Sequence, residues 1–237
     1  MPENQYLFSL SLIFITLMTY QAFAWLQQKL KAPLLNPMLL AIATLIPLML
    51  YYNITFTQYS DATFPINMLL EPAVVALGFP LYQHLRTIRQ QARTIISLLA
   101  LGVILVIIIS FSMTALLISI PEIAVSLSLK SVTTPIAIAL TEELNGDNSI
   151  TAFAIILAGQ FGALLGPKWL NFINVKSAKA QGLAIGAASH ALGTATVSKI
   201  SYEHGAYSSL SLILSAVITA LISPSLITLL AQLLTNS

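Results

Sequence analysis

The chain has 237 residues, of which 57% are hydrophobic and 8% are charged, and its formal net charge is +2. A soluble domain carries about 25% charged residues, so this composition excludes a protein whose entire surface faces water. The small net charge, without a basic run among aromatic residues, gives no indication of nucleic-acid binding. The chain has no cysteine, which excludes disulfides and thiol catalysis.

Six long apolar segments predict helices that cross a bilayer core of about 30 Å. They occupy residues 7–26, 34–52, 64–82, 95–120, 150–167 and 207–233. Lys29 and Lys31 follow the first segment and no basic residue precedes it, so we expect a retained span and not a cleaved signal peptide. The expected fold class is an all-α polytopic membrane protein with about six full transmembrane helices.

Two further apolar segments, 122–141 and 181–199, are interrupted midway by polar and turn-forming residues. If both crossed the membrane and the N-terminus lay outside, the acidic loop 141–148 would lie inside and the basic loop 168–179 outside. That placement opposes the Lys/Arg bias of cytoplasmic loops. If both instead re-enter as broken hairpins, every basic residue except Lys130 falls inside. We therefore expect two re-entrant hairpins in the bacterial cytoplasmic membrane, with both termini outside.

Each interrupted segment follows a span, and the two span-plus-hairpin units have opposite orientations. Paired inverted units with broken segments in matching positions are typical of secondary transporters, whose binding site lies at the bilayer midplane. The two units share no convincing residue-level identity, so the repeat is topological. We expect residues 94–237 to form the transport region, and residues 1–93 to form transmembrane helices that serve as a scaffold and in oligomerisation.

The first interrupted segment contains "KSVTTPIA" at residues 130–137. Pro135 lacks an amide hydrogen and suits the first turn of a helix, and Thr134 can cap that helix. We therefore expect one half-helix to end near Ser131 and another to begin at Thr134. Unpaired amides at such a start bind anions, and Lys130 adds a positive charge beside them. In a second interpretation, Lys130 extends to the headgroups from a shallow hairpin.

The second interrupted segment contains "HALGTATVSK" at residues 190–199. Gly193 is the expected break in this segment, and Thr194 or Thr196 is the expected cap of the helix that follows. Two roles are open for His190. It either makes a hydrogen bond that packs one helix on another, or it binds substrate or handles a proton.

Other notable residues have structural interpretations beside functional ones. Glu71 lies within the predicted span 64–82 and is a candidate for proton coupling, unless that span begins near Pro72, where Glu71 would be interfacial. Four-residue glycine spacing predicts close helix contacts, at Gly162 and Gly166 and at Gly182 and Gly186. An acidic cluster is expected to form a solvated loop, and it comprises Glu142, Glu143 and Asp147.

Enzyme motifs are absent from the sequence. It has no G-x-S-x-G elbow, no H-E-x-x-H zinc pair and no glycine-rich phosphate loop. Ser189 and His190 do not form a catalytic dyad, because adjacent side chains on a helix diverge by about 100°. With three histidines in the whole chain, no histidine-rich metal site is evident. We therefore expect neither enzymatic activity nor a cofactor.

The motifs together resemble one family of bacterial membrane proteins. The matching pieces are "PLLNPMLL" (33–40), "EPAVVALGFPLY" (71–82), "KSVTTPIA" (130–137), "GQFGALLGP" (159–167), "GLAIGAASHALGTA" (182–195), "GAYSSL" (205–210) and "SPSL" (223–226). In their order they are similar to the LrgB/CidB family, whose members are described as antiholin-like and include a plastid glycolate/glycerate translocator. The resemblance covers nearly the whole chain.

The resemblance implies either transport of small carboxylates such as glycolate, glycerate or pyruvate, or control of murein hydrolase release and lysis together with a small LrgA-like membrane partner. It implies polar site residues at Lys130, Ser131, Thr133, Thr134, Pro135, Ser189, His190, Gly193 and Thr194. The chain departs from the family pattern at Glu71, where glycine is usual, at Gln181, where a basic residue is usual, and at Ala187, where threonine is usual.

Three functions are therefore open. The first is an alternating-access carrier of small organic anions, in which Lys130 and the half-helix starts hold the carboxylate while His190 orients it or handles a proton. The second is a regulatory subunit of a lysis-control complex without flux of its own. The third is a passive pore for small solutes. We expect the chain to form a homo-oligomer, a dimer, in the lipid bilayer.

Overall fold

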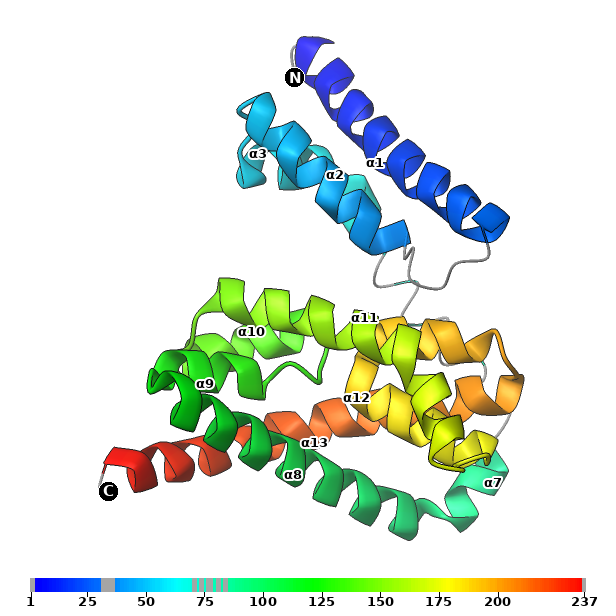
Figure 1. Ribbon diagram of the computed structural model, residues 1–237, viewed down its shortest axis with the longest axis vertical. Helices are drawn as coiled ribbons and strands as arrows, with labels where there is room; N and C mark the ends of the chain where they lie inside the picture. Colours follow the sequence, from blue (N-terminus) through cyan, green and yellow to red (C-terminus); the bar gives the residue numbers. More distant parts are fainter. Residues whose placement is uncertain are drawn as a thin grey trace. The chain divides into compact units, whose positions relative to one another are not determined.

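The computed structural model describes residues 3–30, 37–69, 72, 75, 79, 82 and 85–235. Within these ranges all regular secondary structure is helical, which confirms the all-α prediction. The chain divides into two compact units, Met1–Ala76 and Leu77–Ser237 (Figure 1). The functional division of the chain after residue 93 stays a prediction.

The first unit contains α1 (Glu3–Leu30), α2 (Pro37–Tyr51), α3 (Phe56–Ala62) and α4 (Phe64–Asn67). The Thr16 hydroxyl lies 3.0 Å from the Tyr59 hydroxyl and so joins α1 to α3. A capping box between Thr55 and Gln58 begins α3, and α2 and α3 meet at a bend of 117°. Nine of the 19 residues of the predicted span 64–82, including Glu71, lie outside the described residues.

The second unit contains α7 (Leu85–Gln90), α8 (Ala92–Ile118), α9 (Pro121–Ser128), α10 (Thr134–Glu143), α11 (Asn148–Phe172), α12 (Ala178–Ser198) and α13 (Tyr202–Thr235). Among the described residues of both units, four helices are long and apolar enough to cross a membrane, and the bent pair of α2 and α3 brings this to five at most. The four stretches are Tyr6–Leu30, Ala92–Ile118, Asn148–Phe172 and Tyr202–Leu233. They coincide with four of the six predicted spans.

The first interrupted segment consists of the two half-helices α9 and α10, and Figure 1 shows the chain entering along α9 and returning along α10. The exact ends differ in part from the prediction. The second half-helix begins at Thr134, as predicted, but the first ends at Ser128 and not near Ser131. The N-cap position of α10 is Thr133 and not Thr134, and the Thr133 side chain makes no capping hydrogen bond. Pro135 occupies the second helical position, which is compatible with proline because amides of the first turn have no helical partner.

The second interrupted segment, α12, reverses direction at His190, whose backbone φ is 41° and ψ is −136°. The predicted break at Gly193 was therefore wrong by three residues. A Cβ on Gly193 would lie 3.2 Å from the carbonyl oxygen of Ile185, whereas residues eight apart in a straight helix are about 12 Å apart. Gly193 thus allows the two halves of α12 to approach each other just beyond the reversal.

A buried hydrophobic cluster surrounds the turn between α9 and α10. It joins Ile107 and Phe111 of α8 to Leu129 and Val132 of the turn and to Ile155 of α11. In a bilayer these side chains stabilise the turn by close van der Waals packing and not by removal from water, because lipid tails are as apolar as leucine. The turn is therefore anchored in the interior of the unit.

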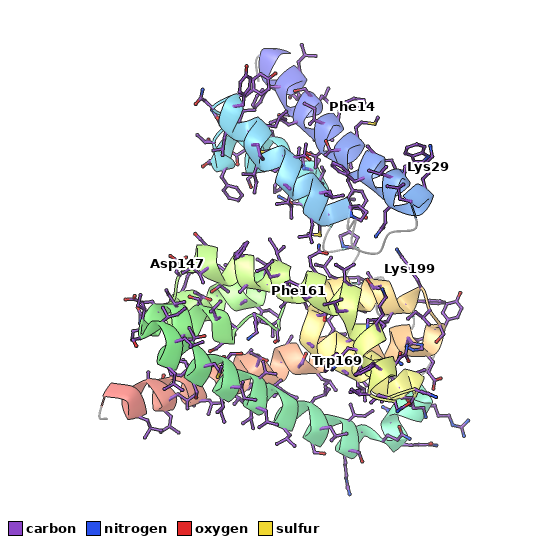
Figure 2. The ribbon with its side chains drawn as sticks, in the orientation of Figure 1. Phe14, Lys29, Asp147, Phe161, Trp169 and Lys199 are labelled. Carbon is purple, nitrogen blue, oxygen red and sulfur yellow. The ribbon has the colours of Figure 1, made fainter. Side chains whose placement is uncertain are left out.

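The outward faces of the long helices carry large apolar side chains, as a lipid-facing surface requires. Phe161 and Trp169 project from α11 (Figure 2) and are 60% and 62% exposed. Figure 2 also shows Asp147 and Lys199 toward opposite ends of this unit. The acidic loop before α11 and the basic residue after α12 therefore lie at different ends of the helix bundle.

Candidate functional site

Glycines bring the first half of α12 into close contact with α11 on one side and α13 on the other. A Cβ on Gly162 would collide with the Ser189 side chain. A Cβ on Gly182 would lie 2.8 Å from the His204 carbonyl oxygen, and one on Gly186 would lie 2.9 Å from the Ser208 Cα. The predicted packing role of the spaced glycines is thereby confirmed.

His190 is held against α11 by its ring. Its Nε2 lies 3.0 Å from the Ile155 carbonyl oxygen, and because a carbonyl only accepts, Nε2 carries the proton. The ring occupies space left by Gly159, since a Cβ there would lie 2.6 Å from the imidazole Cε1. The side chain is 5% exposed. This geometry matches the helix-packing role that the sequence left open for His190.

The hydroxyl of Thr194 joins the second half of α12 to the reversal at His190 and to α13. It donates to the His190 carbonyl over 2.8 Å and lies 2.9 Å from the Ser208 hydroxyl of α13. Ser189 is fully buried, and its hydroxyl oxygen has no hydrogen-bond partner. Four predicted site residues of the second hairpin, Ser189, His190, Gly193 and Thr194, are thus packed between helices.

Lys130 lies in the turn between α9 and α10 and is half-buried. Its ammonium donates to the Ser110 hydroxyl of α8 and, over 3.2 Å, to the Leu127 carbonyl. Ser110 lies about 12 Å along α8 from its end at Ile118, at 1.5 Å per residue. The ammonium is therefore held inside the bundle by α8 and by its own turn.

A cavity of about 410 Å³ lies between α8, the first hairpin tip, the first half of α12 and α13. Its lining comprises Leu98, Leu99, Gly102, Val103, Val106, Ile107, Ser128, Leu129, Ser131, Ala180, Leu183, Ala184, Ala187, Ala188 and Thr219. The part of α8 that lines the cavity, from Leu98 to Ile107, is about 13 Å long. The deep end is closed by Ile107 and Leu129, which are 1% and 0% exposed, whereas Leu98 at the other end is 57% exposed.

Of the nine predicted site residues, Ser131 lines this cavity. Lys130 stands between two lining residues, Leu129 and Ser131, and its ammonium is bonded one helical turn of α8 beyond Ile107. The remaining residues of the first tip lie at the start of α10, where Thr133 is half-buried and Thr134 and Pro135 are exposed. The two predicted groups of polar residues therefore do not converge on one pocket.

Sequence reasoning missed Ser110, Ser128 and Thr219. Ser110 lies in the apolar run "VIIISFSM" (106–113), where its hydroxyl among apolar residues was the only feature that could have indicated a site. Isolated hydroxyls in helices commonly bond the carbonyl four residues back, as Ser128 does with Ala124, so the signal is weak. Ala187, a departure from the family pattern, also lines the cavity and makes it more apolar than a threonine would.

Gln181, another departure from that pattern, joins three helices. Its amide nitrogen donates to the Asn171 side chain and to the Val175 carbonyl, each over 2.8 Å, and its carbonyl oxygen accepts from His204 Nε2 at 3.2 Å. His204 Nδ1 in turn lies 2.8 Å from the Ser201 hydroxyl. An amide both donates and accepts, which a lysine or arginine at this position could not do.

Asp147, the last residue of the acidic cluster, caps the N-terminus of α11. Its side chain accepts from the backbone amides of Ser149 and Ile150, over 2.8 and 2.9 Å. The Glu142 carboxylate accepts from the side-chain amide of Asn148 over 2.9 Å. In the part of the chain that the structure describes, no group of three or more His, Asp or Glu side chains is placed to hold a metal ion.

We expect His190→Gly to be less destabilising than His190→Ala. Both variants lose the bond to Ile155, but a φ of 41° is costly for alanine and not for glycine, by about 1–3 kcal/mol. The melting temperature of the purified chain in detergent should therefore rank wild type, then His190→Gly, then His190→Ala. An alanine variant as stable as the glycine variant would contradict the strain at this residue.

Comparison with known proteins places the chain in one family. The LrgB-like family model matches residues 16–229. The holin-like protein CidB of Staphylococcus epidermidis is 34% identical over 226 residues, which are 95% of this chain and 99% of that protein. The YxaC protein of Bacillus subtilis is 30% identical over 213 residues, 90% of this chain and 93% of that protein. No solved structure matches the chain. The chain therefore belongs to the LrgB-like family of membrane proteins.

Proposed function

We propose that the chain is a secondary transporter of small organic anions, carboxylates of the glycolate, glycerate or pyruvate kind, that works by alternating access. One observation carries the proposal. A cavity lined by α8 and α12 ends at Ser131, in the turn of a broken helix pair, and the ammonium of the half-buried Lys130 lies just beyond that end. Ionisable groups inside a membrane protein are costly and mark substrate or ion pathways.

The turn offers a carboxylate three kinds of partner. The Lys130 ammonium supplies the charge, and a carboxylate that takes the place of the Ser110 hydroxyl makes a stronger, charge-assisted bond. Ser131, which lines the cavity, supplies a hydroxyl group. In the first turn of α10 the amides of Thr134 and Ile136 are free of helical partners and favour a negative charge, whereas Pro135 between them has no amide hydrogen.

The orientation of the cavity suits an inward-open state. By the positive-inside rule, the loop before α12, with Lys176, and the first turn of α12, with Lys179, lie in the cytoplasm. The cavity begins near that loop, at Ala180, and ends at the buried residues Ile107 and Leu129. We propose six spans and two hairpins in an inverted repeat, both termini outside, and a transport region over 94–237 that moves against the scaffold formed by 1–93. Proton coupling through His190 or Glu71 stays a prediction.

A second candidate function rests on the relatives. The chain is 34% identical to proteins described as holin-like, which favours a regulatory subunit that controls murein hydrolase release and lysis with an LrgA-like partner. That function needs no solute pathway, so the cavity and the buried lysine would have no role in it. A passive pore is separated from a carrier by its kinetics, because pore flux neither saturates nor shows counterflow.

Counterflow in proteoliposomes separates these functions. Vesicles holding the chain, with and without an LrgA-like partner, are loaded with unlabelled pyruvate, glycolate or glycerate, and uptake of the labelled acid is followed. A carrier gives a saturable overshoot. Absence of exchange under every loading, with the partner present, would overturn the transport proposal in favour of the regulatory one, and uptake that rises linearly with concentration would favour a pore.

A further inference from the structure

The cavity is larger and more apolar than a two- or three-carbon hydroxy acid requires. At about 410 Å³ it falls in the range of roughly 300–1,000 Å³ that holds drug-sized ligands. Hydroxyl-bearing residues contribute Ser128, Ser131 and Thr219, and every other lining residue is glycine, alanine, valine, leucine or isoleucine. A hydroxyl group on the ligand would find few partners along most of this surface and would lose water there.

The polar and apolar parts of the cavity are separated in space. Ser131 lines the cavity near its closed end, where Ile107 and Leu129 shut it. The Lys130 ammonium lies just beyond this end, bonded to Ser110 one helical turn of α8 past Ile107. From there the lining runs about 13 Å along α8 to the exposed Leu98 without a charged residue. A ligand that fits this arrangement has one negative charge at one end and a hydrocarbon tail.

The side of the cavity between α8 and α12 is open because its residues are small. Gly102 of α8 and Ala184 and Ala188 of α12 line the cavity and are exposed. No heavy atom lies within 4 Å of a Cβ built on Gly102. The space beside Gly102 is therefore unfilled, and it can accept either a tail of the ligand or a larger side chain.

We propose that this site selects monocarboxylates with an aliphatic tail of about four to six carbons over the two- and three-carbon hydroxy acids. The inference rests on the proposed function and specifies the ligand of the same site. The carboxylate bonds Ser131 and replaces the Ser110 hydroxyl as the partner of the Lys130 ammonium, and the tail lies along α8 toward Gly102. A single cation at the closed end favours one carboxylate over two, since a second would be buried without a partner.

The inference is tested by binding of straight-chain monocarboxylates from acetate to dodecanoate to the purified full-length chain in nanodiscs, by calorimetry. Burial of one methylene corresponds to about a fourfold gain in affinity, so hexanoate should bind about 60-fold more tightly than propionate. The gain should stop once the tail passes Gly102, about 7.5 Å along α8 from Ile107. Lys130→Ala should abolish binding at every length. Equal affinity across the series, or a fall with length, would overturn the inference.

Two variants keep the test decisive. Gly102→Leu fills the space beside the tail, so hexanoate affinity should fall at least tenfold while propionate affinity changes less than twofold. Ala188→Leu fills the same cavity from α12 and replaces the first variant if that one fails to fold. The matched control is Ser97→Leu, because Ser97 is exposed on α8 and lies outside the cavity.

Other occupants of the open side give different results, and each would overturn the inference. Affinity that keeps rising to dodecanoate and is indifferent to Lys130→Ala would identify a groove for lipid acyl chains. A change of oligomeric state in Gly102→Leu, without a change in affinity, would identify a contact between two copies of the chain. Binding that depends on chain length, without any counterflow, would overturn the transport proposal but support the proposed class of ligand. Counterflow without any dependence of binding on chain length would support transport but overturn the proposed class of ligand.

Discussion

Lys130→Ala is expected to abolish saturable exchange of carboxylates, with a fall in kcat/KM of at least about 30-fold. A charged hydrogen bond to a desolvated carboxylate contributes about 2–5 kcal/mol, and 1.4 kcal/mol is a factor of ten. The variant should remain folded, because the alanine leaves behind the Ser110 hydroxyl and the Leu127 carbonyl, neutral groups that each lose one bond. Counterflow of labelled pyruvate measures the effect.

The matched control for this variant is Lys199→Ala. Lys199 is an exposed lysine at the end of α12, so its removal changes the net charge equally and touches no cavity residue. Exchange in Lys199→Ala should stay within twofold of wild type. If Lys130→Ala, monodisperse and with wild-type melting temperature, exchanged pyruvate normally, the anion site would have to lie elsewhere in the chain.

Gly186→Ala is expected to destabilise the chain strongly, whereas Gly102→Ala should stabilise it slightly. A Cβ on Gly186 would lie 2.8 Å from the carbonyl carbon and 2.9 Å from the Cα of Ser208, so α12 and α13 would have to separate along their backbones. Overpacking of this kind costs about 1–3 kcal/mol or more. On Gly102 the added Cβ meets no atom within 4 Å, and alanine gains about 1 kcal/mol of helix propensity over glycine.

The two alanine variants change the same atoms in the same type of residue, so they separate packing from propensity. Thermal unfolding of each purified variant in the same detergent should lower the melting temperature for Gly186→Ala and raise it slightly for Gly102→Ala. Equal melting temperatures would contradict the close approach of α12 to α13 that positions the wall of the cavity.

Hydropathy and length predicted the long helices well, because a continuous apolar run of such length satisfies its backbone within one helix in lipid. α8, α11 and α13 lie where 95–120, 150–167 and 207–233 predicted them. The break before Pro135 was also predictable, since proline restricts the chain locally. Six spans and the inverted repeat stay predictions beyond the four or five spans found among the described residues.

The reversal in α12 could not be predicted from local sequence. A histidine at positive φ is unfavourable on its own, and it is held there by the Ile155 carbonyl and by the space at Gly159, both from another helix. Gly193, the residue that local rules favoured for the break, serves instead for the close approach of the two halves. The contacts that stabilise this strained backbone come from another helix, so the sequence of α12 alone does not reveal them.

The candidate site was predictable only in part, for a similar reason. Lys130 and Ser131 were identified from polar residues in an apolar run, and the cavity ends beside them. The cavity itself depends on α8 and α12 lying on either side of it, which brings Gly102 and Ala184 into one lining although they are far apart in sequence. Neither residue carries a chemical signal of its own.

The most direct measurement uses the absence of cysteine from the chain. Ser131→Cys introduces a single thiol at the closed end of the cavity, and Ser177→Cys introduces one at an exposed position just before α12. Both are treated with a membrane-impermeant maleimide in inside-out vesicles, with and without pyruvate or butyrate. If the tip of the first hairpin binds the carboxylate, Ser131→Cys reacts from the cytoplasmic face and the acid protects it, while Ser177→Cys reacts equally in both conditions. Labelling of Ser131→Cys that no carboxylate slows would contradict a carboxylate site at this hairpin tip.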